Sequence, residues 1–325
     1  MARAVIGKEF GPPEAYALDQ LPSRDVGAHD VRISIRAAGI SFVDVLTAQG
    51  QYQVKPPLPF CPGSEAAGIV VETGSEVTGF SPGERVAFSG WGGMFAEEAV
   101  VPESSVQPMP AGMDFAEAAT FPVSYATAWH ALTDRGKMQS GETLLVLGAG
   151  GATGYAAVQV GKYLGAKVIA SASSEAKREL ALHGGADAVV EARADDWRQQ
   201  VKAANDGKGV DVVFDPVGGD ATDSAFRSLG WGGRHLVIGF PGGIASLRTN
   251  LPLLKGASLV GVDIRQFGEN EPQRASDNRK RIFALAEQGI LRPKIAKRFP
   301  LERFREAMEE AAAGQCAGRI VLDLA

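Results

Sequence analysis

Cysteine is scarce in this chain of 325 residues: only Cys61 and Cys316 occur, and they lie in opposite halves of the sequence. Two such distant thiols form neither a disulfide framework nor a Cys-x-x-Cys metal knuckle, and we expect a reducing, cytoplasmic setting. Histidine is equally scarce, and its four copies are scattered: His29, His130, His183 and His235. Because zinc sites need clustered thiolates or imidazoles, we expect no metal, and we interpret each histidine as structural or surface.

An excess of basic residues is also missing, since 33 Lys and Arg face 38 Asp and Glu, giving a net charge of −5. This balance argues against a nucleic-acid partner or an anionic membrane surface. One stretch, Thr143–Gly161, approaches membrane-spanning length with nineteen residues that carry no charge. It contains five glycines, however, and therefore predicts a buried strand, a glycine turn and a buried helix.

The second half of the sequence alternates short apolar runs with helical stretches, the pattern of βαβ units and a parallel sheet covered on both faces. Helices are expected at 155–164, 175–183 and 195–204. The predicted strands are 143–147, 167–171, 188–190, 210–214, 236–238 and 258–262. The fold class is therefore α/β, with a doubly wound, six-stranded parallel sheet in a domain of residues 124–263.

Residues 1–123 have a different pattern. Residues 31–35 alternate apolar and polar side chains, and frequent Gly and Pro turns predict an irregular, β-rich antiparallel domain. After residue 264 the sequence has a charged stretch at 270–281. Two amphipathic helices and a strand follow it, at 282–288, 301–313 and 319–322. We expect residues 264–325 to return to the first domain, because a finished sheet has little room for them.

Glycine is abundant, with 40 copies where roughly 23 are average for this length. Four of them lie in the turn Gly148–Gly154, between the first strand and the first helix of the predicted sheet. Glycine there lets the backbone approach a pyrophosphate, and the helix N-terminus directs amides at the anion. The turn predicts a dinucleotide site that includes Gly151, Ala152, Thr153 and Gly154; the alternative is a tight turn without a ligand.

The end of the second strand indicates which dinucleotide binds. NAD sites usually carry an acidic residue there, whereas this chain has Ser171 and Ser173 and no acid before Glu175. Lys177 lies on the next helix, and Arg193 follows the third strand. Hydroxyls and cations suit a 2′-phosphate, so NADPH is favoured, although Lys177 on a solvated helix face remains the alternative.

Several motifs together resemble the medium-chain dehydrogenase/reductase superfamily, in its zinc-free, zeta-crystallin-like NADPH:quinone oxidoreductase branch. The likeness covers nearly the whole chain and rests on Gly39-Ile-Ser-Phe-Val-Asp44, Pro62-Gly-Ser-Glu65, Pro82-Gly-Glu-Arg-Val86, Ala126-Thr-Ala128 and Asp215-Pro-Val-Gly218. The resemblance implies a GroES-like catalytic domain in front of a Rossmann domain. Two departures are Ser41, where the branch usually has asparagine, and Ala192, where related enzymes often have tyrosine.

The resemblance also implies a site. Without a metal, the hydride acceptor should already be activated, as quinones and α,β-unsaturated carbonyls are, and the oxyanion formed needs a hydrogen-bond donor. The implied catalytic residues are Ser41, Asp44 and Tyr52, with Tyr125 as a further candidate donor. The cofactor residues implied besides those of the glycine turn are Thr127, Val217, Gly239, Phe240 and Arg319.

The function expected is hydride transfer from NADPH to a small quinone or enone. Two alternatives stay open: an enoyl-thioester reductase, and a non-catalytic NADPH-binding structural or sensing protein. The resemblance further implies a homodimer or homotetramer, formed through the apolar edge strand 258–262, which would otherwise be exposed.

Overall fold

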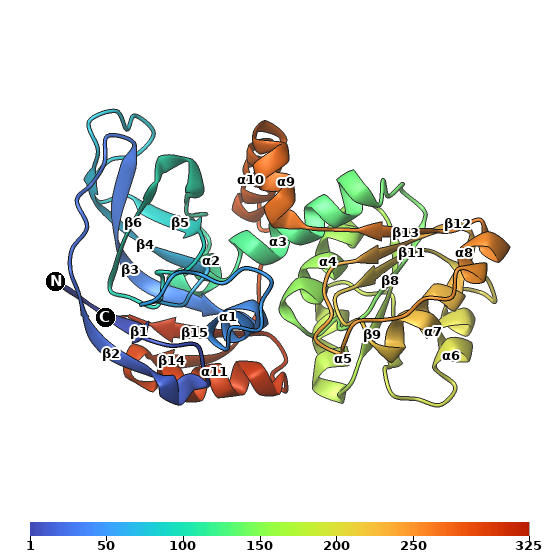
Figure 1. Cartoon of the computed structure of the whole chain (residues 1–325). Helices are drawn as coiled ribbons and strands as arrows, with labels where there is room; N and C mark the ends of the chain where they lie inside the picture. Colours follow the sequence, from blue (N-terminus) through green and yellow to red (C-terminus); the bar gives the residue numbers. More distant parts are fainter. Residues whose placement is uncertain (325) are drawn as a thin grey trace. The chain divides into compact units, whose positions relative to one another are not determined.

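The computed structural model describes residues 1–324, which form two compact units (Figure 1). Unit 1 contains Met1–Val123 and the segment from Arg292 onward, and unit 2 contains Ser124–Leu291. The first boundary coincides with the expected one. The segment that returns to unit 1, however, begins at Arg292 rather than at 264.

Residues 264–291 stay in unit 2 because they pack against its own elements. They form α9 (Ile264–Asn270) and α10 (Pro272–Glu287), and the ring of Phe267 stacks on His130 with the ring centroids 3.8 Å apart. Arg274 donates from Nη2 to Oδ1 of Asp134 at 2.6 Å. Both partners lie in the π-helix η3 (His130–Arg135), which follows α3 (Pro122–Trp129).

Unit 2 is built on a six-stranded parallel sheet, as the sequence predicted. Its strands, in spatial order, are β10 (Ala188–Glu191), β9 (Lys167–Ala172), β8 (Thr143–Val146), β11 (Val210–Asp215), β12 (Leu229–Val237) and β13 (Ser258–Gly261). The order reverses between β8 and β11, so the sheet is doubly wound, and ligands of such sheets bind at the carboxyl ends of the strands beside this reversal.

Helices connect these strands and flank the sheet (Figure 1). They are α4 (Ala152–Tyr163), α5 (Glu175–His183), α6 (Trp197–Ala204), α7 (Asp220–Ser228) and α8 (Asn250–Lys255). Helix α4 packs beside α5, and α6 packs beside α7. Since parallel crossovers are right-handed, the first pair covers one face of the sheet and the second pair covers the other.

Unit 1 is a β-rich domain with a two-stranded sheet and a seven-stranded sheet. The first pairs β1 (Ala2–Gly7) with β2 (Tyr16–Leu21). The second has the order β14 (Ile295–Pro300), β15 (Arg319–Asp323), β3 (Asp30–Ile40), β4 (Glu65–Thr73), β5 (Arg85–Ser89) and β7 (Val106–Pro108), and β6 (Glu98–Pro102) also pairs with β3. Strand β15 pairs with both β14 and β3, so it lies inside the sheet.

Short helices complete unit 1. They are η1 (Pro13–Ala15), α1 (Phe42–Ala48), η2 (Glu103–Ser105), α2 (Phe115–Ala119), η4 (Leu301–Arg303) and α11 (Phe304–Ala313). Within residues 1–324, no helix combines the length and the apolar character needed to cross a membrane.

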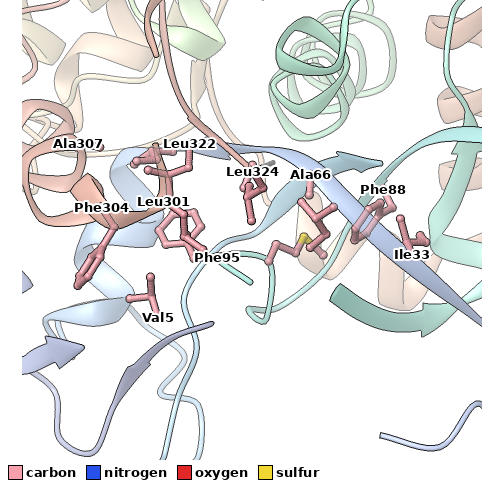
Figure 2. Close-up of a cluster of buried hydrophobic side chains, with 14 of the residues drawn as sticks. Val5, Ile33, Ala66, Phe88, Phe95, Leu301, Phe304, Ala307, Leu322 and Leu324 are labelled. Carbon is pink, nitrogen blue, oxygen red and sulfur yellow. The ribbon is translucent and has the colours of Figure 1, made fainter. Parts of the chain in front are cut away.

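The core of unit 1 joins the two ends of the chain (Figure 2). Val5 from β1 and Phe95 pack in one buried cluster with Phe304 of α11 and Leu322 of β15. All four side chains are at most 1% exposed. The C-terminal segment is therefore part of the first domain's core and not an appendage to it.

Candidate functional site

The glycine turn of unit 2 leaves a stretch of bare backbone at the start of α4. Gly148 has φ +58°, which favours glycine, and a Cβ on Gly154 would lie 2.3 Å from the Gly148 carbonyl oxygen. The N-cap of α4 is Gly151, so no side chain caps the amides of Ala152, Thr153 and Gly154. Uncapped first-turn amides beside a backbone without Cβ atoms fit a pyrophosphate.

Lys177 lies against this turn. A Cβ on Gly150 would come within 2.4 Å of the Lys177 Cβ and 2.6 Å of its Cγ, so only glycine fits beneath the lysine stem. Ser174 begins α5, and its Oγ accepts a hydrogen bond from the Lys177 N–H at 3.4 Å. The cation predicted to bind a 2′-phosphate is thus carried by a helix whose first turn touches the glycine turn.

The serines at the end of β9 have different surroundings. Ser171 is 2% exposed, and its Oγ accepts a hydrogen bond from Nε1 of Trp197 at 2.9 Å, so this hydroxyl is bonded within the core. Ser173 is exposed, as is Arg193 after β10. Of these three predicted cofactor residues, the structure leaves Ser173 and Arg193 accessible and buries Ser171.

Arg178, the neighbour of Lys177, pairs with Glu191 at the end of β10. It also donates from Nη1 to the carbonyl oxygen of Ala172 at 3.3 Å. Through these two contacts the Arg178 guanidinium links α5 to the ends of β9 and β10.

A buried network around Asp215 shapes the turn that follows β11. Its Oδ1 accepts from the N–H groups of Val217 and Gly218, each at 2.9 Å. Its Oδ2 accepts from Oγ1 of Thr222 at 2.7 Å and contacts Nε2 of His235 at 2.9 Å. Burial acts to raise the pKa of Asp215, but the hydrogen bonds from His235, Gly218 and Thr222 outweigh it and hold the pKa below its ordinary value.

The turn after β12 lies beside this one. Gly239 donates to the Asp215 carbonyl oxygen at 3.4 Å, and a Cβ on Gly218 would be 2.8 Å from both Cα and Cβ of Phe240. The predicted cofactor residues Val217, Gly239 and Phe240 are therefore brought together at the carboxyl ends of two adjacent parallel strands, next to the reversal in strand order.

Thr127 lies buried on α3, 8% exposed. That helix is joined to α4 through Tyr125, whose hydroxyl donates to Oε1 of Gln159 at 2.8 Å. Tyr125 is 1% exposed, so its hydroxyl is bonded inside unit 2.

In unit 1, Ser41 and Asp44 form the N-cap of α1. Oδ2 of Asp44 accepts from the Ser41 N–H at 2.8 Å and from its Oγ at 2.7 Å, and the Ser41 Oγ accepts from the Asp44 N–H at 3.3 Å. Burial raises the pKa of Asp44 above its ordinary value, although hydrogen bonds from Ser41 and Ser64 oppose the shift. The structure thus joins two of the three predicted catalytic residues in a capping box.

Tyr52 is the third predicted catalytic residue. It follows α1, and its N–H donates to the Leu46 carbonyl oxygen at 3.2 Å. Its ring stacks with that of Trp91, at 6.5 Å between centroids and 25° between planes. Trp91 was assigned no role from the sequence.

Arg319 lies on β15 in unit 1, whereas the other predicted cofactor residues lie in unit 2. Its guanidinium forms an ion pair with Oε1 of Glu65, and both side chains are buried. Glu65 Oε2 also accepts from the Val123 N–H at 3.1 Å, where unit 1 ends. Burial raises the pKa of Glu65, and the charge of Arg319 opposes that shift.

Nowhere in residues 1–324 do three or more His, Cys, Asp or Glu side chains gather in an arrangement that could hold a metal ion. Cys61 is a free thiol whose pKa is raised to about 12 by burial, and Cys316 is also free.

Comparison with known proteins identifies the family. Residues 27–111 match the family described as alcohol dehydrogenase GroES-like domain, and residues 152–278 match the one described as zinc-binding dehydrogenase. Quinone oxidoreductase-like protein 2 of Mus musculus is 36% identical over 324 residues, which are 99% of this chain and 92% of that protein. The chain belongs to the medium-chain dehydrogenase/reductase superfamily.

Further relatives place this medium-chain dehydrogenase/reductase in the zinc-free quinone oxidoreductase branch. Quinone oxidoreductase of Rattus norvegicus is 32% identical over 314 residues, 95% of this chain and 94% of that protein. The solved structure of a mycobacterial protein complexed with NADPH is similar with a TM-score of 0.90 at 26% identity, covering 100% of both chains. The family and branch predicted from the motifs are confirmed, and the chain is an NAD(P)-dependent oxidoreductase.

Sequence analysis of this medium-chain dehydrogenase/reductase interpreted His235 as structural or surface and assigned no role to Trp197 or Trp91. His235 is 0% exposed and contacts Asp215, which lies 20 positions away in the sequence. The indole N–H of Trp197 donates to the hydroxyl of Ser171, which lies 26 positions away. Trp91 lies between Gly90 and Gly92, in a loop to which the sequence analysis assigned no role. The loop's three glycines were its one signal, since they indicate a backbone held in a special conformation.

Proposed function

We propose that this oxidoreductase is zinc-independent and reduces quinones or α,β-unsaturated carbonyl compounds with NADPH. The observation that carries the proposal is the glycine turn, where a Cβ on Gly154 would lie 2.3 Å from a backbone oxygen and the amides of α4 are uncapped. NADPH bound there supplies hydride from C4 of its nicotinamide ring. Since the described residues offer no metal-binding group, the acceptor must bring its own electron-withdrawing carbonyl.

The preference for NADPH is supported by the surroundings of the glycine turn. Lys177 lies over Gly150, while Ser173 and Arg193 are exposed near the ends of β9 and β10. The carboxylate at the end of β10, that of Glu191, is paired with Arg178. Two cations and a hydroxyl recognise a 2′-phosphate, whereas a ribose 2′-OH would call for an acceptor such as a carboxylate.

Protonation of the reduced acceptor is assigned to Ser41 and Asp44. Burial raises the pKa of Asp44, which favours its protonated form. In the structure the Ser41 Oγ donates to Oδ2 of Asp44 at 2.7 Å. Protonation of Asp44 would reverse this contact, so that the Ser41 hydroxyl could donate to the oxyanion that forms on the acceptor. Tyr52 and water are the other candidate proton donors, and the experiment below must distinguish them from Ser41.

We further propose that the enzyme works in the cytoplasm as a homodimer or homotetramer. Both cysteines are free. Edge strand β13 presents Leu259 with 50% of its surface exposed, and a second copy would cover this edge.

Anaerobic oxidation of NADPH, followed by absorbance with 1,4-benzoquinone, 9,10-phenanthrenequinone and simple enones, tests the proposal. We expect turnover with at least one of these acceptors and a fall in kcat of about 10²-fold in Ser41→Ala, with Tyr52→Phe as the parallel variant. Tight NADPH binding without turnover would favour a non-catalytic role. Turnover only with an enoyl thioester would favour the thioester reductase.

A further inference from the structure

We infer that Glu65 is a positioning residue for proton transfer: by holding the Arg319 guanidinium, it leaves Asp44 as the carboxyl that carries a proton beside Ser41. The inference rests on the proposed function and names the group that prepares its proton donor. All four residues lie in unit 1, where β4 and β15 begin and where β3 passes into α1.

The register of the seven-stranded sheet brings Glu65 and Arg319 together. Strand β3 lies between β15 and β4, and near its end Ile40 pairs with Ile320 while Gly39 pairs with Glu65. A Cβ on Gly39 would lie 3.1 Å from Cγ of Glu65 and 2.6 Å from the Ala119 carbonyl oxygen. Glycine at this position therefore leaves room for the Glu65 side chain directly before Ser41.

The cluster contains two carboxyl groups and one cation. Asp44, Glu65 and Arg319 are 4%, 1% and 5% exposed. With both carboxyl groups ionised, the cluster would have a net charge of about −1 in the interior of unit 1, and a buried charge without a counterion is costly. One proton removes this charge, so the two carboxyl groups share a single proton.

The hydrogen bonds decide which carboxyl group stays ionised. Oε1 of Glu65 accepts from Nη2 of Arg319, and its Oε2 accepts from the Val123 N–H at 3.1 Å. Asp44 accepts from the N–H and the hydroxyl of Ser41, at 2.8 Å and 2.7 Å, and both of these donors are uncharged. Since the charged donor pairs with Glu65, the proton belongs to Asp44.

The electrostatics of the cluster agree with this assignment. Burial raises the pKa of Asp44, and the opposing effects of Ser41, Ser64 and the Arg319 charge do not cancel the rise. Burial also raises the pKa of Glu65, the Arg319 charge lowers it, and the Asp44 charge raises it again, as expected of two acids that share one cation. Helix α11 packs against α1, and its buried residues are uncharged: Phe304, Ala307 and Met308.

This division of roles supplies the proton that the reaction consumes. Hydride from bound NADPH leaves an oxyanion on the acceptor. The Ser41 hydroxyl passes its proton to that oxygen and takes the proton of Asp44, which becomes a carboxylate, and a proton from water then restores Asp44. Without the charge of Glu65, Arg319 would act on Asp44 alone and keep it ionised at neutral pH.

The first test compares Glu65→Gln with the wild type in the single-turnover rate of NADPH oxidation by 9,10-phenanthrenequinone, under anaerobic conditions and across a pH series. In the wild type the rate should fall as pH rises through the pKa of Asp44. Glu65→Gln removes the charge, so this fall should begin at a pH lower by about one unit or more. Glu65→Asp retains the charge and should stay within about half a unit of the wild type. Glu97→Gln, which removes a glutamate paired with Arg3 in the same unit, is the matched control and should not move the fall.

Urea unfolding across a pH series tests the proton on Asp44 without an acceptor. In the wild-type background, Asp44→Asn should gain stability relative to its parent between about pH 4 and pH 7, because the folded pKa of Asp44 is raised. In the Glu65→Gln background the folded pKa of Asp44 should be depressed, so its carboxylate stabilises the fold as pH rises. The same Asp44→Asn replacement should then lose stability over that interval.

Infrared spectroscopy examines the wild type directly and does not depend on the folding of Glu65→Gln. A protonated-carboxyl band should be present at neutral pH, absent in Asp44→Asn and retained in Glu97→Gln. A wild type without this band, a band that persists in Asp44→Asn, or a pH dependence that Glu65→Gln leaves unmoved would overturn the inference. If the wild type reduces no acceptor, the proposed function fails, and the infrared band and the unfolding series alone decide whether Glu65 leaves the proton on Asp44.

Discussion

Nε2 of His235 lies 2.9 Å from Oδ2 of Asp215, and this buried contact ties β12 to the end of β11. The other carboxylate oxygen of Asp215 holds the N–H groups of Val217 and Gly218. The histidine therefore helps to set the turn that we assign to the cofactor, without facing the cofactor itself.

Asp215→Asn should lower the free energy of unfolding by about 1–3 kcal/mol at neutral pH, because a buried N–H···O⁻ contact is lost. The folded pKa of Asp215 is depressed, so its ionised form stabilises the fold above the unfolded pKa, and this stabilisation disappears as pH falls through the folded pKa. The difference in free energy of unfolding between wild type and variant should therefore become smaller below about pH 4. Urea unfolding across a pH series measures it, with the exposed Asp195→Asn as control; a gap constant with pH would contradict the assignment.

Asp44→Asn should show the opposite pH dependence. Burial raises the folded pKa of Asp44, so stability linked to this group is fully present below the unfolded pKa and is lost as pH rises through the folded value. Asparagine keeps an oxygen that can accept from the N–H and Oγ of Ser41. The variant should gain stability relative to wild type as pH rises from about 4 to 7. The same unfolding series checks this, and a relative loss over that interval would refute it.

Gly154→Ala should weaken dinucleotide binding at least about tenfold, and should also destabilise the fold, because its Cβ meets a backbone oxygen that cannot move aside. The matched control is Gly268→Ala in α9, where a Cβ would have open space. That change should stabilise the protein by up to about 1 kcal/mol and leave binding unchanged. Isothermal titration with NADPH and thermal unfolding distinguish the two variants. Equal affinities would show that the turn does not hold the pyrophosphate.

Lys177→Met and Arg193→Ala should each weaken NADPH binding about tenfold while leaving NADH binding unchanged. Methionine keeps an apolar stem over Gly150 and removes the charge. Lys202→Ala, on the exposed side of α6, is the control for a solvated cation. Kd values for both cofactors are the readout. If NADH binds as tightly as NADPH, the preference is wrong.

Leu259→Lys should convert an oligomer into monomers, because a charge on edge strand β13 blocks pairing with a second copy. Leu182→Lys on α5 is a matched control, since Leu182 is 47% exposed and Leu259 is 50% exposed. Size-exclusion chromatography with light scattering gives the mass of each. A wild type that elutes only as a monomer would disprove the oligomer.

Local patterns predicted unit 2 well because each strand is a short apolar run beside a turn. These patterns failed where the local sequence favours one structure and pairing or burial in the folded protein favours another. The glycine-rich residues 230–233 resemble a turn, yet β12 begins at Leu229 because Leu229 pairs with Val210 of β11, ahead of a register shift to the pair of Arg234 with Val212. The charged stretch at 270–281 concealed the first turns of α10, whose buried side includes Ala275 and Ile282.

The candidate site divides in the same way. The glycine turn and the capping box at Ser41 are local motifs, and both could be predicted or placed from neighbouring residues. The partners of Ser171 and Asp215 come from other strands and helices, so their roles depend on the assembled sheet. The pairing of Tyr52 with Trp91 likewise joins two loops far apart in the sequence.

The interior position of β15 sets the order in which the two units can fold during synthesis on the ribosome. Strand β3 is translated before unit 2, but its neighbour β15 (Arg319–Asp323) is translated after it. Unit 2 is complete once Leu291 has emerged, while unit 1 must wait with one edge of β3 unpaired and part of its core missing. Unit 2 therefore can fold before unit 1 is complete, and strand β3 needs protection from aggregation until β15 emerges.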